Sequence, residues 1–288
     1  MNLIDIREIQ SKSILSPSHL KESDYDYSLN PYVGCRFGCV YCYASFMGRF
    51  VGKRVQDWGE YVFAKMNAPV LLKKEIAKLH EKGEGKWIWL SSVTDPYQAL
   101  ELKYRLTRKC LEVLVDYGFR GGVSFLTKSP LVLEDLPLLK KLHKVEVGMT
   151  VTSTDDDISR YFEKFTPTSS DRLRALKKLH TEGIPTYTFI GPLLPHYVAE
   201  EGKLDKLMRT IKNAGVNDVY VEHLNLSGYI LGRLKREIKG IDPVILQTFY
   251  SSKTKEYRNK LDAIVSRLLK KNRLHIRMGG TLYHKEMN

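Results

Sequence analysis

The chain has 288 residues, 43% hydrophobic and 27% charged, a balance typical of a globular protein with a sizeable core and not of a disordered chain. No run approaches the ~18 apolar residues that a membrane span needs, and the charged first ten residues contain no apolar signal core. Four cysteines without a secretory signal indicate the cytoplasm, where clustered thiols bind metal more often than they cross-link.

The formal net charge is +13, and much of it lies near the C-terminal end. Residues 233–288 contain 14 Lys and Arg against 5 Asp and Glu, which gives +9 for that region. A terminal basic region suits a polyanion such as RNA or DNA, because each contacted phosphate releases counterions. A lysine-rich solvated surface explains the charge equally well.

In chain order, residues 1–27 are polar and turn-prone and are expected to form an irregular N-terminal arm. Apolar runs typical of strands follow at 29–34, 86–92, 122–128, 145–153, 185–191 and 218–224. Segments with helical spacing of apolar residues alternate with them, at 69–83, 104–118, 169–183 (with Ser170 as the expected N-cap) and 202–215. A basic amphipathic helix is predicted over 252–272, followed by a short strand.

Six strands that alternate with helices require a parallel α/β sheet, since each crossover returns the chain to the same end. Repeats of about 35 residues favour a partial (β/α)6 barrel over an open nucleotide-binding sheet. We expect the arm at 1–27, the barrel at 28–240, and a basic helix-and-strand extension at 241–288 packed on the core.

The sequence GCRFGCVYCY at 34–43 places Cys35, Cys39 and Cys42 on one loop directly after the first predicted strand. Three thiolates can hold three irons of a 4Fe-4S cluster and leave the fourth iron open for a substrate or cofactor. Gly34 and Gly38 let the backbone bend around such a cluster. Structural zinc with a distant histidine, or a redox pair at 39–42, are alternatives, although no second cysteine pair completes a zinc site.

This loop resembles the signature of the radical S-adenosylmethionine (radical SAM) enzymes, including an aromatic residue, Tyr41, before the last cysteine. The resemblance implies a partial (β/α)6 barrel, a 4Fe-4S cluster held by the three cysteines, and S-adenosylmethionine bound at the fourth iron. One electron then splits the cofactor into methionine and a 5′-deoxyadenosyl radical. An electron donor such as ferredoxin or flavodoxin is implied as a partner.

Four further stretches resemble the branch that contains spore photoproduct lyase: NPYVGCRFGCVYCYA, TDPYQALE, LTKSPL and IPTYTFIGPLLP, in that order within residues 29–225. The resemblance implies that Tyr41 lies beside the adenine, Asp95 meets the cofactor's amino group, and Lys128 pairs with its carboxylate. It implies a place near the cofactor for Thr150 and an adenine-side position for Leu194.

The same resemblance makes Tyr43 a candidate relay for radical transfer. Ordinary alternatives exist for each position: Asp95 can open a turn, Lys128 can be a solvated loop residue, and the tyrosines, Thr150 and Leu194 can serve in packing. Asp95 and Lys128 follow predicted strands, at the end where barrel sites assemble.

The chain departs from the branch in two places. Ser92 stands where the lyase has its hydrogen-donating cysteine, and a hydroxyl does not donate a hydrogen atom to a carbon radical as a thiol does. Cys110 is no substitute because it belongs to an apolar helical stripe. The loop EKFTPTS at 163–169 replaces a sequence that related proteins write EPRAPSP, so an altered substrate pocket is expected.

Three further groups of polar residues are candidates for a functional role. His196 follows the fifth strand segment and suits proton transfer or a surface position. Glu222 and His223 end the sixth strand, where alternation allows only one of them to point inward. The acids at 155–157 suit the start of a helix better than a metal site.

The leading hypothesis is a radical SAM enzyme that modifies or repairs RNA or DNA, bound through the basic C-terminal region. One alternative directs the same radical chemistry at a peptide or small metabolite. The other is a nucleic-acid-binding protein whose iron–sulfur cluster performs no radical catalysis.

Overall fold

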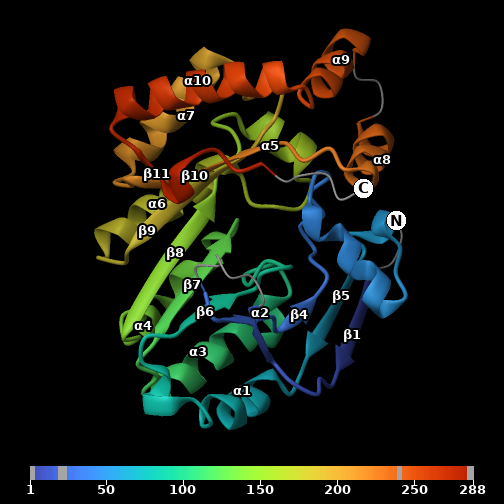
Figure 1. The fold of residues 1–288 in the computed structure, drawn as a ribbon. Coiled ribbons are helices and arrows are strands. Elements are labelled where there is room, and N and C mark those ends of the chain that lie inside the picture. Colours follow the sequence, from blue (N-terminus) through green and yellow to red (C-terminus); the bar gives the residue numbers. More distant parts are fainter. Residues whose placement is uncertain (1–3, 19–24, 239–241, 284–288) are drawn as a thin grey trace.

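The computed structural model describes residues 4–18, 25–238 and 242–283. Most of its strands belong to one sheet of eight, which curves through the centre of the molecule (Figure 1). The order across this sheet is β11 (His275–Ile276), β10 (Asp218–His223), β9 (Thr186–Leu193), β8 (Lys144–Thr150), β7 (Gly122–Thr127), β6 (Trp87–Leu90), β3 (Tyr27–Leu29) and β2 (Leu15–Pro17). All neighbours from β3 to β11 are parallel, and β2 runs antiparallel at one edge.

The six parallel strands from β3 to β10 stand side by side in sequence order, which is the arrangement of a (β/α) barrel. The sheet does not close, because β2 and β11 form its two edges. The prediction of a partial (β/α)6 barrel is therefore confirmed. A second, three-stranded sheet lies beside it, in the order β1 (Asp5–Ile9), β5 (Tyr61–Lys65) and β4 (Tyr32–Val33).

Helices alternate with the strands along the chain, and some of them pack on one face of the large sheet. The helices are α1 (Ala68–Ile76), α2 (Glu101–Tyr104), α3 (Leu106–Tyr117), α4 (Leu136–Leu139), α5 (Asp156–Phe162), α6 (Ser169–Thr181), α7 (Glu201–Asn213), α8 (Gly228–Glu237), α9 (Pro243–Ser251) and α10 (Lys255–Asn272). Helix α1 packs on α3, and α7 packs on α10. These two pairs lie at opposite ends of the view in Figure 1. Short 3₁₀ segments occupy Tyr43–Val51, Val55–Asp57, His80–Gly83, Pro130–Asp135 and Arg277–Gly279.

Strand alternation gives the large sheet two different faces. The helix-covered face carries fully buried apolar side chains, among them Ile88, Val123, Phe125, Val147, Met149, Val219 and Val221. We call the opposite side the inner face. The strand register places on it Trp87, Trp89, Ser124, Leu126, Glu146, Gly148, Thr150, Tyr187, Phe189, Tyr220 and Glu222. The inner face is thus aromatic and polar, whereas the helix-covered face forms the core.

The prediction of an irregular N-terminal arm is wrong for the part that the structure describes. Strand β1 pairs in parallel with β5, from Asp5 opposite Tyr61 to Ile9 opposite Lys65. Strand β2 pairs antiparallel with β3. Both pairings depend on partners that lie beyond the local sequence, so the arm's turn-prone composition does not indicate them.

The first barrel strand also differs from the prediction at 29–34. The strand that joins β6 is Tyr27–Leu29, and Tyr32–Val33 pairs with β5 in the small sheet instead. Pro31 separates the two pieces, because proline has no N–H for a sheet ladder. Its carbonyl accepts a hydrogen bond from the Lys65 N–H at 3.0 Å, at the start of the second sheet.

The predicted helices are present with shifted ends. Thr168, and not Ser170, caps α6, because its side chain and that of Asp171 form a reciprocal capping box. The predicted segment 69–83 ends as an α-helix at Ile76. The basic helix predicted at 252–272 is α10, and Cys110 is fully buried within α3 as expected for a core residue. No helix within the described ranges is long and apolar enough to cross a membrane.

Candidate metal and cofactor site

The cysteine loop runs from Gly34 to Cys42, between β4 and the 3₁₀ segment that begins at Tyr43. Gly34 has a φ of +84°, and a Cβ there would lie 2.5 Å from the carbonyl oxygen of Tyr61. The loop therefore needs glycine at this position for both its conformation and its close approach to β5. It turns the chain so that the side chains of Cys35 and Cys39 lie buried beneath the surface.

All four cysteines are free thiols, and the three of the loop are close enough to influence one another electrostatically. Burial raises the pKa of the Cys35 and Cys42 thiols, and it raises the pKa of the Cys39 thiol to about 12 although Lys128 lowers it. Buried thiols of this kind lose their protons when a metal binds them. The donor set is soft and sulfur-only, which fits an iron–sulfur cluster.

The zinc alternative finds no support in the described part of the chain. No group of three or more His, Cys, Asp or Glu side chains is placed there to hold a single metal ion. A four-iron cluster presents its irons at separate corners, so its thiols need not converge on one point. The acids at 155–157 begin a helix as predicted, with the Asp155 side chain accepting hydrogen bonds from the N–H groups of Asp157 and Ile158.

Asp95 and Lys128 lie beside this loop, after β6 and β7. The Asp95 carboxylate is buried and accepts hydrogen bonds from the N–H of Tyr97 at 2.9 Å, the hydroxyl of Thr127 at 2.7 Å and the N–H of Lys128 at 2.8 Å. Burial raises the pKa of this carboxyl despite the three donors. Asp95 thus ties two strand ends together while it stands within electrostatic reach of Cys35.

The ammonium group of Lys128 lies 5.9 Å from the centre of the Tyr41 ring. Burial lowers its pKa, but the neighbouring Cys39, Glu163 and Cys42 more than offset this, so the pKa is raised overall. A cation within electrostatic reach of the Cys39 and Cys42 thiols, after a strand of the parallel sheet, is suited to hold a ligand carboxylate.

Tyr41 is buried, and its hydroxyl donates a hydrogen bond to the Glu163 carboxylate. The hydroxyl of Thr152 lies 3.3 Å from the same phenol oxygen. Glu163 is in turn paired with Arg172, and neither side chain has solvent exposure. The sequence reasoning missed both residues, because nothing in their spacing relates them to a tyrosine more than a hundred positions away.

Tyr43 differs from Tyr41 in being 47% exposed. Its hydroxyl donates a hydrogen bond to the carbonyl of Ser92, and its own carbonyl accepts one from the Tyr229 hydroxyl at 3.0 Å. Burial raises the pKa of its phenol, and Cys42 and Glu222 act in the same direction. Tyr43 and Ser92 therefore stand together at the surface beside the cysteine loop.

Thr150 and Leu194 lie at the carboxyl ends of β8 and β9, and both are buried. The carbonyl of Thr150 accepts a hydrogen bond from Arg172 Nη1 at 3.3 Å, so Thr150 belongs to the polar surroundings of Glu163. Leu194 is part of the main apolar core, and its carbonyl accepts the N–H groups of Val198 and Ala199.

Gln98 is another residue that sequence reasoning missed. Its Oε1 accepts a hydrogen bond from the N–H of Arg36 at 2.8 Å, and its Nε2 donates to the carbonyl of Gly34 at 3.2 Å. The segment TDPYQALE therefore holds the cysteine loop through Gln98 as well as carrying Asp95. A glutamine in a loop offers no spacing signal by which this role could be found.

Glu222 and His223 point to opposite sides, as alternation predicts. Glu222 lies within electrostatic reach of Cys42 in the cysteine loop. His223 is buried on the helix side, where its Nε2 lies 2.8 Å from Oδ1 of Asp262 on α10. His196 is exposed and stands edge-on against the Tyr197 ring.

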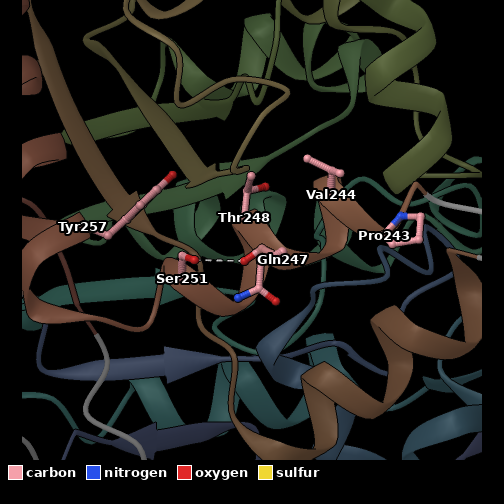
Figure 2. A pocket seen from close by; sticks show the side chains of 6 residues that line it. All are labelled: Pro243, Val244, Gln247, Thr248, Ser251 and Tyr257. Atoms are coloured by element: carbon pink, nitrogen blue, oxygen red, sulfur yellow. Dashed lines mark hydrogen bonds between the residues drawn. The ribbon is translucent and has the colours of Figure 1, made fainter.

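A pocket of about 540 Å³ opens elsewhere, on the surface of α9. Figure 2 shows that its walls come from one side of α9 and from Tyr257 at the start of α10. The lining is mostly apolar and consists of Pro243, Val244, Gln247, Thr248, Ser251 and Tyr257. It contains no cysteine and no residue of the cysteine-loop surroundings, so we assign it no part in the chemistry.

Comparison with known proteins defines the class. The radical SAM superfamily model matches residues 29–208. Protein MJ0683 of Methanocaldococcus jannaschii is 35% identical over 77% of this chain and 79% of its own length. Protein ORF301 of Acidianus two-tailed virus is 30% identical over 76% and 75%, and Rv2578c of Mycobacterium tuberculosis is 29% identical over 80% and 68%. The chain belongs to the radical SAM superfamily.

Solved structures agree at the level of the fold. Spore photoproduct lyase in complex with dinucleoside spore photoproduct matches 94% of this chain and 81% of its own, with a TM-score of 0.66 and 15% identity. A variant of that lyase with bound AdoMet and the dinucleoside matches equally well. The chain is thus an enzyme of a superfamily that uses a 4Fe-4S cluster and S-adenosylmethionine.

Proposed function

We propose that this enzyme abstracts hydrogen from a nucleic acid, in a modification or repair reaction, and that Cys35, Cys39 and Cys42 hold its cluster. The observation that carries the proposal is the set of three free thiols on one loop, two of them buried and that of Cys42 half-buried, near the Lys128 ammonium at the carboxyl end of a partial barrel. When bound, the cluster supplies the electron that cleaves S-adenosylmethionine to methionine and a 5′-deoxyadenosyl radical.

The chain's own residues bind and orient the cofactor. Lys128 pairs with the methionyl carboxylate, because its ammonium faces the cysteine loop and keeps its charge. Asp95 accepts from the amino group with the carboxylate lone pair that its three present donors leave open. The buried Tyr41 ring offers its face to the adenine, Thr150 contributes from the end of β8, and Leu194 forms an apolar wall after β9.

Tyr43 is proposed as the residue that meets the substrate and relays a hydrogen atom. Ser92 lacks the thiol chemistry needed for that task, and the Tyr43 phenol touches the Ser92 carbonyl at the same place. Its exposure gives a substrate access to the ring.

Three features support a nucleic-acid substrate. The inner face carries Trp89, Phe189 and Tyr220, with the rings of the last two stacked at 6.2 Å, and such aromatic surfaces bind bases by stacking. Exposed cations of α10, such as Lys260 and Lys270, suit phosphates. The fold is shared with spore photoproduct lyase, which is known in complex with a dinucleoside.

We further propose that a ferredoxin or flavodoxin supplies the electron and that the enzyme works in the reducing cytoplasm. The four free cysteines support that location, since an oxidising compartment would favour their cross-linking.

The substrate is tested with the anaerobically reconstituted protein and the cofactor. Formation of 5′-deoxyadenosine is measured alone and with bulk tRNA, double-stranded DNA or single-stranded DNA. Stimulation by one polymer, together with deuterium transfer from that polymer into 5′-deoxyadenosine, supports the proposal. Turnover that no polymer changes, but that a peptide or metabolite extract stimulates, would contradict it.

A further inference from the structure

The Glu163 carboxylate sits at a junction of four chain segments, completely buried. It accepts hydrogen bonds from the Tyr41 hydroxyl in the cysteine loop, from the Thr152 hydroxyl at 2.8 Å and from the Ser159 hydroxyl of α5 at 3.2 Å. Arg172 of α6 forms an ion pair with it.

The backbone makes a second connection at the same place. The N–H of Val40, between Cys39 and Tyr41, donates a hydrogen bond to the carbonyl of Phe162 at 3.0 Å. The residues at the end of α5 thus hold the cysteine loop by its main chain and by its tyrosine side chain. Arg172 is itself fixed by the carbonyl oxygens of Thr150 and Pro167.

The buried negative charge of Glu163 is compensated by two cations, Arg172 and Lys128. Arg172, which forms an ion pair with Glu163, and the Lys128 ammonium both lower the pKa of the Glu163 carboxyl. Two positive groups and one negative group therefore lie within electrostatic reach of the Cys39 thiol. A buried ion pair adds little to stability on balance, but the loss of one member leaves an uncompensated charge.

We propose that Glu163 is a positioning residue for the cysteine loop, which fixes the Tyr41 ring and sets the electrostatic environment of the cluster. This inference depends on the proposed function, because it assumes that the loop holds the cluster and that Tyr41 meets the cofactor. Glu163 acts on the reaction through Tyr41, Lys128 and Arg172, without touching the cofactor.

Two variants separate the hydrogen bond from the charge. Glu163→Gln keeps the size and the acceptor oxygen but removes the negative charge. It therefore leaves Lys128 and Arg172 uncompensated, and the midpoint potential of the cluster shifts in the positive direction. Tyr41→Phe removes only the hydroxyl, so it leaves the potential close to that of the wild type. Tyr41→Phe weakens binding of S-adenosylmethionine roughly tenfold because the ring is no longer held, whereas Glu163→Gln keeps the acceptor oxygen and with it most of the affinity.

Glu101→Gln is the matched control. Glu101 is also a buried glutamate that accepts a hydrogen bond from a buried tyrosine, Tyr32, and that tyrosine belongs to a separate apolar cluster. Run at about pH 8.5, where both carboxyls are ionised, it reports the general effect of removing such a charge. We expect it to leave the potential and the cofactor affinity unchanged.

The experiment reads iron content, the midpoint potential by electron paramagnetic resonance, and cofactor affinity by equilibrium dialysis, all without turnover. A positive shift of the potential for Glu163→Gln alone, with weaker cofactor binding for Tyr41→Phe alone, supports the proposal. If both variants match Glu101→Gln in potential and affinity while the wild type binds four irons and cleaves the cofactor, Glu163 is structural and the proposal falls. A wild type that binds no cluster would instead remove the proposed function, and this inference with it.

Discussion

The Asp95 carboxylate accepts a hydrogen bond from the backbone N–H of Lys128 at 2.8 Å, so the two residues that flank the cysteine loop are joined directly. One follows β6 and the other follows β7, two neighbouring parallel strands. The bond fixes the carboxyl ends of these strands relative to each other. A carboxylate and an ammonium are thereby held at the edge where barrel enzymes assemble their sites.

Replacement Asp95→Asn tests that arrangement. In the variant an amide NH2 group replaces one carboxylate oxygen, so donors that bond to this oxygen in the wild type would lose their acceptor. We therefore expect the free energy of unfolding to fall by roughly 1–3 kcal/mol. Affinity for S-adenosylmethionine is expected to fall as well, measured by equilibrium dialysis. The control is Asp26→Asn, which removes a carboxylate that accepts the Trp87 N–H at the opposite end of β6. An equal loss of affinity in that control would contradict the assignment.

The assignment of the three loop cysteines as cluster ligands predicts the iron content of their variants. Alanine at Cys35, Cys39 or Cys42 is expected to abolish the four-iron cluster, read as iron per chain and as its absorbance after anaerobic reconstitution. Cys110→Ala is the control, because Cys110 is fully buried within α3 among apolar neighbours. It should cost about 1 kcal/mol of stability through the small cavity and retain its iron. Iron loss in Cys110→Ala equal to that in the loop variants would contradict the assignment.

Features that depend on a short stretch of sequence could be predicted, whereas contacts between distant positions could not. The cysteine loop, Asp95 and Lys128 are visible in the sequence because each belongs to a short stretch after a strand. The Tyr41–Glu163 contact joins positions 122 residues apart, and no local pattern predicts such a contact. The same reason hides β1, whose partner β5 lies more than fifty residues further along the chain.

The basic C-terminal region predicts a salt effect. Reversal of Lys260 and Lys270 to Glu on α10 should weaken RNA or DNA binding and reduce the slope of log K against log salt by ~0.9 for each duplex phosphate that the protein no longer neutralises. Lys73 and Lys74 on α1 provide a charge-matched control, since α1 and α10 lie at opposite ends of the molecule (Figure 1). Fluorescence anisotropy over a salt series measures both pairs. Identical slopes for the two double variants would indicate that net charge alone matters.

Glu101 predicts a pH effect on stability. Burial raises the pKa of its carboxyl from 4.5 to about 7. Between pH 4.5 and about pH 7 the Glu101 carboxyl keeps its proton in the folded chain and loses it in the unfolded chain. The contribution of this carboxyl to the free energy of unfolding therefore decreases as the pH rises. Glu101→Gln removes the effect. As the pH rises from about 5 to about 7.5, the unfolding free energy of the variant minus that of the wild type should increase by about 2 kcal/mol. Urea titrations of both metal-free proteins check this, and a constant difference across that range would contradict it.

The central claim is that the cysteine loop performs radical chemistry, and the most direct test is formation of 5′-deoxyadenosine. The anaerobically reconstituted protein is incubated with dithionite and S-adenosylmethionine, beside Cys39→Ala treated in the same way. Product from the wild type and none from the variant is the predicted result. A wild-type protein with a full four-iron cluster that forms no 5′-deoxyadenosine, with or without nucleic acid, would contradict the account.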